Sequence, residues 1–523
     1  MSSIRKRLFS LLFIASTAGA VTPGPAPDWQ PYAPTAFARA AADDRLILLD
    51  LVAVWCHWCH VMDATTYSDP RVVDRLRAGY VAVRADHDAR PDLAERYRDY
   101  GWPATVILRA DGTELVKRAG YIEPEAMLAL LERARAGAAD VSPQAPDAVA
   151  ATATSAVLTD ALRDELERRH LATDDPVGGG LDLMQRFLDP DAVEWDLHLA
   201  ARGDEDAERR ARRHLDAALA LIDPAFGGAY QYSTHGDWAH PHYEKIMRTQ
   251  LACLRAYSLG HAILGDPRYR LAGEQVVAWL RDFMQADNGG FHTSQDADLE
   301  QGIKAHAYFA LDRAQRLARG LPRIDRHQYA DANGMAIEGL VTLYGVTGDR
   351  RMLGLAVGAL DWVLRNRRDG EGGFRHGERD VAGPYLADTL YMGRAFLALY
   401  EVSGQRAWLD QAVAAADFID ARFRRPDGGL LSAVDNGTPL RPLAQIDQNI
   451  HAARFFYALA EQTGDARHAA LAAHVMRYLN TPAIARSRVT DAGILLADRD
   501  RRFSADSKQS LTLIIFNKKD DAA

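Results

Sequence analysis

A short apolar run that ends in two cysteines constrains this chain more than any other feature. Residues 46–55 read LILLDLVAVW, which is rich in Leu and Val and has the length of one buried strand. Cys56 and Cys59 follow directly, and the segment after them is polar and compatible with a helix. The pattern therefore predicts a strand that ends at Cys56 and a helix whose first turn contains Cys59.

This placement suits thiol–disulfide chemistry. Free N–H groups at a helix N-terminus stabilise a thiolate, so we expect Cys56 to be the nucleophile and Cys59 the resolving thiol. Asp50 stands six positions before Cys56, where strand alternation predicts a carboxylate buried behind the pair. Such a carboxylate has a raised pKa and can accept the proton of Cys59. The alternative is a strand Asp that caps a backbone group or forms an ion pair.

The flanking residues extend the candidate site. His57 either stabilises the Cys56 thiolate when it is charged or is a solvated side chain. Pro103 opens a later apolar segment, where a cis peptide is expected, and with Trp102 it would present backbone to a partner. We expect five side chains around the two cysteines to contact the substrate: Trp55, His57, Trp58, Trp102 and Pro103.

The order of elements around the cysteines is similar to the thioredoxin fold. After the helix we expect a strand over residues 80–86 and a helix over 92–100. The Pro103 strand, a hairpin strand over 114–118 and a helix over 123–136 follow. We therefore predict a thioredoxin-like α/β domain over residues 35–136.

Two metal-based alternatives share these cysteines. Cys56-His-Trp-Cys59-His60 also matches the C-x-x-C-H attachment motif of c-type haem, although no second axial ligand stands out in the sequence. A zinc site could use Cys56, Cys59, His57 or His60, but no second ligand pair has a recognisable spacing. We predict no metal and no cofactor other than a redox-active Cys56–Cys59 disulfide.

The N-terminus predicts export. Residues 1–20 have a basic start, a short apolar core and an Ala-Gly-Ala end, so we expect a signal peptide cleaved after Ala20 and a periplasmic or secreted protein. Residues 21–34 are Pro-rich and predict an extended spacer. No later run is long enough to span a membrane. With three cysteines in all, Cys253 in an apolar helix is expected to be inert.

The length and charge set further bounds. At 523 residues the chain is expected to hold two or more domains, and its net charge of -9 argues against nucleic acid as a partner. Residues 137–159 are rich in Ala, Pro, Ser and Thr and predict a linker. Beyond it, helical segments alternate with Gly pairs and Gly-Asp steps up to about residue 500. Because helical hairpins cannot bury their inner faces alone, we predict an all-α (α/α)6 toroid over 160–500. Residues 501–523 predict a strand-like tail, with the apolar segment at 511–516.

Carboxylates and aromatic side chains gather in the loops of the predicted toroid. They suit a sugar site, which needs one acid and one base or nucleophile beside an aromatic platform, but they also resemble ordinary helix caps. The candidates at the mouth are Trp238, His242, Glu244, Asp296, Asp298, Asn333 and Asp388.

Several blocks together resemble the thioredoxin-domain proteins related to spermatogenesis-associated protein 20. The resemblance implies a thioredoxin-like domain joined to a six-hairpin toroid like those of glycosidases and sugar epimerases. Where such proteins tend to carry Tyr-Asp-Asn, this chain has Arg248-Thr249-Gln250, which removes a carboxylate from the mouth and weakens the expectation of a glycosidase-like reaction. The blocks are WCHWCHVM at 55–62, YSDP at 67–70, GWP at 101–103, WAHPHYEK at 238–245 and SQDAD at 294–298.

The sequence thus predicts an exported thiol–disulfide oxidoreductase whose partners are protein thiols or disulfides. The toroid is expected to be a docking or sensing module. The alternative is a carbohydrate-active or carbohydrate-binding toroid with an accessory thioredoxin domain, which would bind a saccharide at its mouth.

Overall fold

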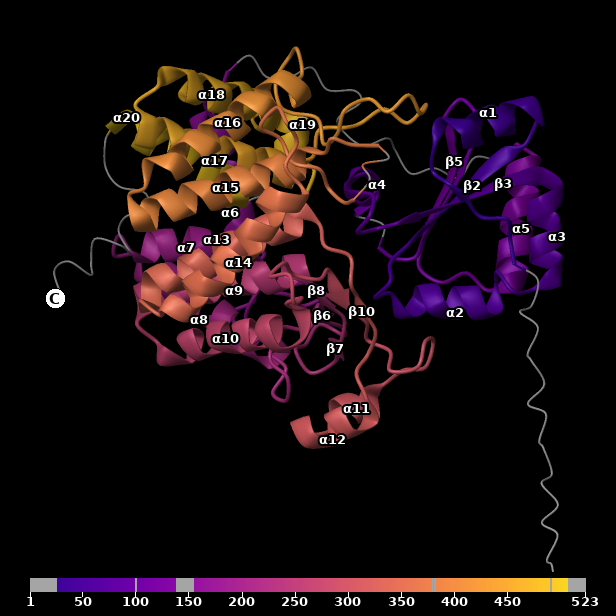
Figure 1. Cartoon of the computed structure of the whole chain (residues 1–523), viewed down its shortest axis with the longest axis horizontal. Coiled ribbons are helices and arrows are strands. Elements are labelled where there is room, and N and C mark those ends of the chain that lie inside the picture. Colours follow the sequence, from indigo (N-terminus) through magenta and orange to yellow (C-terminus); the bar gives the residue numbers. More distant parts are fainter. Residues whose placement is uncertain are drawn as a thin grey trace, which may run out of the picture.

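The computed structural model describes residues 26–98, 101–137, 155–378, 380, 382–489 and 492–506. The predicted signal peptide, most of the predicted linker and the apolar segment at 511–516 lie outside these residues. An α/β domain comes first in the chain and a larger helical domain follows, as Figure 1 shows. Among the described residues, no helix combines the length and the apolar character needed to cross a membrane.

The first domain is built on a five-stranded sheet of order β1-β3-β2-β4-β5. The central strand β2 (Leu46–Val52) is parallel to β3 (Tyr80–Asp86) and antiparallel to β4 (Ala104–Leu108). The edge strands are β1 (Gln30–Pro31), parallel to β3, and β5 (Glu114–Ala119), antiparallel to β4. The apolar run before the cysteines therefore becomes the middle of the sheet, as its composition predicts.

Helices cover both faces of this sheet. Successive strand residues point to opposite faces. Ile47 and Leu49 pack in one core with residues of α1 (Pro34–Ala42) and α4 (Pro91–Arg96). Leu48 packs in a second core beneath α2 (His57–Thr65), α3 (Pro70–Gly79) and α5 (Pro124–Arg135). This is the predicted thioredoxin-like arrangement.

Two boundaries differ from the sequence-based expectation. The sheet begins inside the predicted spacer, because Gln30 and Pro31 pair with Val83 and Arg84 at the edge of β3. An extended chain beside an open strand edge satisfies its backbone groups by pairing with it. Helix α4 ends at Arg96, before the predicted end at residue 100.

The helical domain is a closed ring of paired helices. Within the described residues, six inner helices each contact the next, and the last contacts the first: α7 (Pro190–Ala200), α9 (Met247–Leu264), α13 (Ala330–Thr347), α15 (Leu386–Ser403), α17 (Ile446–Thr463) and α20 (Ala492–Asp506). An outer helix packs on each: α8 (Glu205–Ala218), α10 (Pro267–Trp279), α14 (Arg350–Asn366), α16 (Arg406–Phe423), α18 (Ala466–Leu479) and, on α20, α6 (Asp160–Ala172). The first and last helices thus form the sixth pair of the predicted (α/α)6 toroid, and the predicted boundary at residue 500 falls inside α20.

Tight turns join inner helices to outer ones at one end of the ring. Four inner helices end at a glycine in the left-handed region, with φ between 65° and 74°: Gly265, Gly348, Gly404 and Gly464. Side chains with a Cβ rarely adopt this conformation, so the glycine ends the helix. Asp266, Asp349 and Asp465 then cap the next helix by accepting a backbone N–H. These turns are the Gly-Asp steps of the sequence.

Long loops join outer helices to inner ones at the other end, and they contain the Gly pairs. Inner-helix amide side chains hold three of these loops through the backbone N–H and C=O of the residue after the Gly pair, and after Gly372–Gly373 the Thr389 hydroxyl accepts the Phe374 N–H. The pairs are Gln250 with Ala229, Asn333 with Phe291, and Asn449 with Leu430. Asn333 therefore has a structural role at the predicted mouth. The loops also contain β6 (Tyr232–Ser233), β7 (Pro241–His242), β8 (Lys245–Ile246), β9 (Ser294–Gln295), α11 (His306–Phe309), α12 (Arg313–Arg319) and β10 (Ile324–Asp325), and α19 (Pro482–Ala485) precedes α20.

Ion pairs fill the inside of the ring. Glu194 of α7 binds Arg255 of α9 at 3.0 Å and also pairs with Arg454 of α17. Arg394 of α15 pairs with Glu338 of α13 at 2.6 Å. Together with Asp500 of α20, these side chains line one central cavity, to which every inner helix contributes a charge. Several of these pairs join neighbouring helices, α7 to α9, α13 to α15 and α17 to α20, so the network favours this order of helices around the ring.

Candidate redox site between the two domains

The two cysteines stand where the strand-to-helix pattern predicts them. Cys56 is the N-cap of α2, and its Sγ accepts a hydrogen bond from the Cys59 N–H at 3.1 Å. Their sulfurs are joined in a disulfide with an S–S distance of 2.02 Å. The residues are 4% and 3% exposed, so the whole molecule covers the pair almost completely.

Asp50 lies behind the disulfide on the face of the sheet that α2 covers. It is fully buried, and Arg84 of β3 donates to its Oδ2 at 2.9 Å. Burial raises the pKa of Asp50 to about 6, although the charge of Arg84 opposes the shift. Its Oδ1 has no hydrogen-bond donor among the described residues. The ion pair and the raised pKa, which the sequence left as alternatives, thus occur together.

An aromatic cluster borders the cysteines. Trp55 Nε1 donates to Asp88 Oδ2 at 3.0 Å, and the His87 ring packs edge-on against both Trp55 and Trp102. The Trp102–Pro103 peptide is cis, and the Pro103 carbonyl accepts the Gly120 N–H at 2.7 Å. The cluster therefore holds Trp55 and Trp102, two of the three predicted tryptophans, beside the redox pair.

Trp58 is the most exposed side chain of the motif. It is 37% exposed, and Lys304 of the toroid places its Nζ 5.2 Å from the ring centroid. A cation over an indole face is attracted by the ring quadrupole. Trp58 thus reaches the edge of the domain interface.

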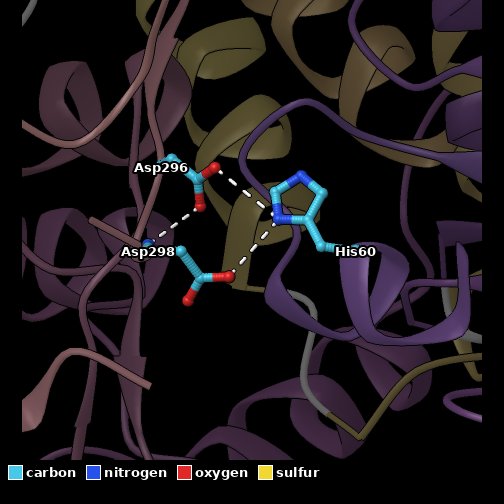
Figure 2. Close-up of side chains that lie close together, drawn as sticks. All are labelled: His60, Asp296 and Asp298. Carbon is cyan, nitrogen blue, oxygen red and sulfur yellow. Dashed lines mark hydrogen bonds and ion pairs between the residues drawn. The ribbon is translucent and has the colours of Figure 1, made fainter. Parts of the chain in front are cut away.

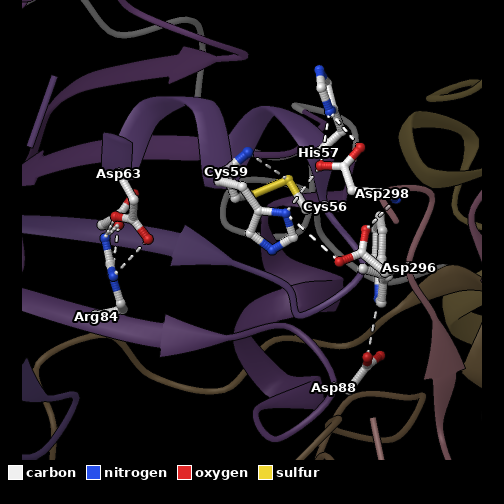
Figure 3. The surroundings of a disulfide bond; sticks show 11 residues. Cys56, His57, Cys59, Asp63, Arg84, Asp88, Asp296 and Asp298 are labelled. Atoms are coloured by element: carbon white, nitrogen blue, oxygen red, sulfur yellow. Dashed lines mark hydrogen bonds and ion pairs between the residues drawn. A yellow bond between two sulfur atoms is a disulfide. The ribbon is translucent and has the colours of Figure 1, made fainter. Parts of the chain in front are cut away.

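The loop after β9 brings two toroid carboxylates to the first turn of α2. Asp298 Oδ1 lies 2.7 Å from His57 Nδ1, and its Oδ2 lies 3.3 Å from His60 Nδ1. Asp296 Oδ2 is 3.7 Å from the same His60 nitrogen. Figure 2 shows both carboxylates pointing at His60, and Figure 3 shows them beside the disulfide. The histidine after each cysteine is therefore bonded to the toroid.

The two carboxylates have opposite pKa shifts. Burial raises the pKa of Asp296 to about 7, and the nearby charges of Asp298 and Glu244 add to the effect. Burial also acts against the ionised form of Asp298, but hydrogen bonds from His57 and His60 outweigh it and lower the pKa of Asp298 to about 2. Asp298 is thus a permanent anion that holds two imidazoles, whereas Asp296 carries a poorly compensated charge.

Further contacts fix the domains against each other. Arg248 of α9 pairs with Glu95 of α4 at 2.5 Å, and Tyr32 donates to Thr438 at 3.2 Å. Burial opposes ionisation of Glu95, yet Arg248 and Arg98 outweigh it and lower the pKa of Glu95 to about 2. Ile246 of the toroid packs against the cluster that contains both cysteines. The toroid therefore covers the disulfide directly.

A second histidine cluster also bridges the domains. His376 Nδ1 lies 2.9 Å from Asp388 Oδ1 and 3.7 Å from Asp331 Oδ1, while Nε2 lies 2.7 Å from the Asp88 carbonyl. Burial works against the charged ring, but Asp388 and Asp331 outweigh it and raise the pKa of His376 to about 10. Since both ring nitrogens face acceptors, the ring is an imidazolium that binds both domains.

The predicted mouth residues fall into separate groups. Asp296, Asp298 and Glu244 gather beside the cysteines, whereas Asp388 belongs to the His376 cluster. Trp238 donates from Nε1 to the Gly178 carbonyl at 3.0 Å. His242 stacks on Tyr232 at a centroid distance of 4.4 Å and lies 3.8 Å from Glu244. Trp238 and His242 thus support loops.

Sequence reasoning missed several residues of this interface. The sequence indicates His60 only as a ligand of the alternative zinc site, and His376, Arg248 and Lys304 are not among the candidates. The signal that could have indicated His60 is its position directly after Cys59, which repeats the position of His57 after Cys56.

Comparisons with known proteins agree with both domains. Residues 24–138 match the family described as a protein of unknown function, DUF255, with a thioredoxin-like DsbH domain, and residues 224–484 match the β-L-arabinofuranosidase GH127 catalytic domain. Spermatogenesis-associated protein 20 of Homo sapiens is 20% identical over 549 residues, which cover 77% of this chain and 68% of that protein. The match to its Mus musculus counterpart covers 40% of that protein.

Two further likenesses concern single domains. The thiol:disulfide interchange protein DsbD of Ralstonia nicotianae is 36% identical over 102 residues, which cover 18% of this chain and 16% of that protein. The crystal structure of a D-mannose isomerase superposes with a TM-score of 0.51 at 11% identity, covering 66% of this chain and 98% of that one. This second likeness shows the fold alone. The chain is therefore similar in sequence to spermatogenesis-associated protein 20, and in it a thioredoxin-like domain that matches the DUF255 family is joined to an (α/α)6 toroid.

Proposed function

We propose that this protein is a thiol–disulfide oxidoreductase that acts through Cys56 and Cys59. The observation that carries the proposal is the disulfide at the N-terminus of α2 with the raised-pKa carboxylate of Asp50 behind it. A helix N-terminus favours the Cys56 thiolate, and a carboxylate with a pKa near 6 is ionised at pH 7 and can accept a proton.

The proposed reaction exchanges one disulfide for another. In the reduced protein, the Cys56 thiolate attacks a substrate disulfide, forms a mixed disulfide and releases one substrate thiolate, which takes up a proton. Cys59 then loses its proton to Asp50 and attacks Cys56 Sγ, which releases the second substrate thiol and forms the Cys56–Cys59 disulfide. The substrate gains two electrons from the protein, and a second dithiol must supply two electrons to reduce the Cys56–Cys59 disulfide again.

The toroid supports a gating role in this proposal. Both sulfurs are nearly inaccessible while Asp298 holds His57 and Ile246 covers the cysteine cluster. A protein disulfide can reach Cys56 only when the loop after β9 separates from α2. We infer that the toroid is a docking module that covers the redox pair between encounters.

We further propose that the exchange occurs outside the cytoplasm, with protein thiols or disulfides as partners. The support is the basic start, short apolar core and small-residue end of residues 1–20. N-terminal sequencing of the mature protein should begin at Val21. A mature chain that keeps Met1 would contradict export by this route.

Reduction of insulin disulfides by the full chain, with dithiothreitol as electron source, tests the redox function. The wild-type protein should accelerate insulin precipitation, and Cys56→Ser should lower the rate to that of dithiothreitol alone. Cys253→Ala is the matched control, because Cys253 is buried in the toroid core. Equal rates for the wild type and Cys56→Ser would refute the proposal.

One observation favours a second function in carbohydrate binding or hydrolysis. Asp296 and Asp298 have pKa values of about 7 and about 2, and a neutral acid beside a carboxylate is the pair that glycoside cleavage needs. Thermal shifts with saccharides, measured in chelator, would support this function if they persist in Cys56→Ser and vanish in Asp296→Ala. The absence of any shift would leave the disulfide chemistry as the proposed function.

A further inference from the structure

The domain interface contains a cluster with the composition of a metal site. His60 Nδ1, Asp296 Oδ2 and Asp298 Oδ2 lie within 4.8 Å of one another, and one of the three residues comes from the redox motif. His60 and Asp298 are 238 positions apart in the chain. No local spacing in the sequence therefore indicates these ligands. Asp296 and Asp298 reach His60 only because the two domains are docked.

The distances within the cluster fit a small divalent cation. A tetrahedral ion with nitrogen and oxygen ligands at about 2.0–2.2 Å separates neighbouring ligand atoms by about 3.3–3.6 Å. His60 Nδ1 is 3.3 Å from Asp298 Oδ2 and 3.7 Å from Asp296 Oδ2. Both separations from His60 Nδ1 are therefore within a few tenths of an ångström of those in a tetrahedral site.

Unpaired buried oxygens point to a missing cation. Asp296 is 1% exposed, and within the described parts of the chain its Oδ2 has no hydrogen-bond donor. Glu244 is 5% exposed and its Oε2 likewise has none there. Its charge acts on Asp296. Buried carboxylates without donors are costly, and binding a metal is one of the ways in which proteins compensate them.

Hydrogen bonds already orient the two aspartates. Asp298 Oδ1 is held by His57 Nδ1 at 2.7 Å, and the Gly302 N–H donates to Asp298 Oδ2 at 2.8 Å. Asp296 Oδ1 accepts the Asp298 N–H at 3.0 Å, which leaves Oδ2 directed at His60 (Figure 2). Such outer contacts fix the direction of ligating side chains in metal sites.

The second cluster of the interface provides a contrast. His376 faces an acceptor with each ring nitrogen, Asp388 at 2.9 Å and the Asp88 carbonyl at 2.7 Å. Both nitrogens therefore carry protons and have no lone pair for a metal. Asp388 Oδ2, like Asp296 Oδ2, is a buried oxygen without a hydrogen-bond donor among the described residues, so the two clusters differ in the state of the histidine ring.

We propose that His60, Asp296 and Asp298 bind one divalent metal ion of the zinc type. The ion neutralises the excess carboxylate charge at the mouth of the toroid. Because its ligands come from both domains, it strengthens the docked arrangement and keeps the Cys56–Cys59 disulfide covered. This inference concerns the oxidised protein and does not depend on catalytic exchange.

Equilibrium dialysis of the tag-free, oxidised full chain against Zn²⁺ tests the site. Oxidised protein is used because thiolates would bind zinc themselves. We expect one equivalent per chain in the wild type, at least tenfold weaker binding in Asp296→Asn, and unchanged binding in Asp331→Asn, the matched change in the second cluster. Zn²⁺ should also slow reduction of the disulfide in the wild type but not in Asp296→Asn.

The Asp296→Asn variant remains interpretable because it is expected to fold. The substitution keeps the shape of the side chain and removes a buried charge, so the midpoint of thermal unfolding without metal should match or exceed that of the wild type. Absence of stoichiometric binding in the wild type would overturn the inference. Equal binding in Asp296→Asn, or binding that appears only after reduction, would overturn it as well.

Discussion

His57 Nδ1 lies 2.7 Å from Asp298 Oδ1, so the residue directly after Cys56 is bonded to the toroid. A thioredoxin-like site that faces a partner would leave this side chain in solvent. Here the partner surface belongs to the same chain, and the disulfide beside His57 is covered. Access to the redox pair is therefore coupled to the docking of the two domains.

Weakening the interface away from the cysteines should expose the disulfide. Arg248→Met removes the toroid partner of Glu95, which keeps Arg98 of its own domain, and a hydrogen bond between charged groups contributes about 1.5–3 kcal/mol. We expect protein reductants to reduce the disulfide roughly tenfold faster or more, measured by alkylation of the released thiols. Arg212→Met, which removes a partly exposed pair with Glu208, is the control and should not change the rate. Identical rates for both variants would show that docking does not limit access.

Asp50→Asn should change the dependence of stability on pH. The pKa of Asp50 is about 6 in the folded protein and 3.8 is its ordinary value, so the folded protein binds this proton more tightly than the unfolded chain does. The resulting contribution to stability is fully present below pH 3.8 and is lost as the pH rises through 6. Urea unfolding between pH 4 and 8 should show the wild type losing about 2.4 kcal/mol relative to Asp50→Asn. Insulin reduction by the variant should be slower, since Cys59 loses its proton acceptor. Parallel pH profiles would contradict the buried carboxylate.

His376 should make the docked protein sensitive to alkaline pH. Its pKa is raised from 6.5 to about 10, so its contribution to stability is complete below pH 6.5 and is lost as the pH rises through 10. Thermal unfolding of the wild type should weaken across this window, and His376→Gln should remove that part of the change. His327→Gln, at an exposed ring, is the control. If His376→Gln and the wild type respond alike, the imidazolium assignment is wrong.

Asn333→Ala should reduce stability without reducing redox activity. The substitution leaves the Phe291 N–H and C=O without their partner, which costs about 1–3 kcal/mol for each unsatisfied group, whereas the Tyr329 carbonyl still accepts the backbone N–H of residue 333. Chemical denaturation should therefore show a lower unfolding free energy, while insulin reduction at low temperature continues at the wild-type rate. Lost activity with unchanged stability would instead place Asn333 in a functional mouth.

The local features of the sequence predicted much of the fold. The Leu- and Val-rich run, the spacing of Cys56 and Cys59 and the strand after Pro103 each depend on neighbours in the chain, so the pattern contains them. The Gly-Asp steps likewise record a left-handed helix end and the cap that follows, as at Gly265 and Asp266. Each of these signals depends only on a few residues that are close together in the chain.

The interface could not be predicted in the same way. His60 and Asp298 come together over 238 positions, and no local pattern records which loop reaches the redox motif. The sequence suggested that Arg248 marks the loss of a carboxylate from a sugar site, but its side chain pairs with Glu95 across the domain interface. Gln30 and Pro31 were predicted to lie in a spacer. Their pairing could not be predicted locally, because the edge of β3 to which they bind is formed by residues far along the chain.

Capture of a mixed disulfide tests the central claim most directly. In Cys59→Ser the resolving thiol is gone, so a substrate disulfide attacked by Cys56 should remain attached to it. Incubation of this variant with insulin, followed by non-reducing peptide mapping, should find the adduct on Cys56 and none in Cys56→Ser. An unmodified Cys56, or an adduct on Cys253 instead, would contradict the assignment of this pair as the site of exchange.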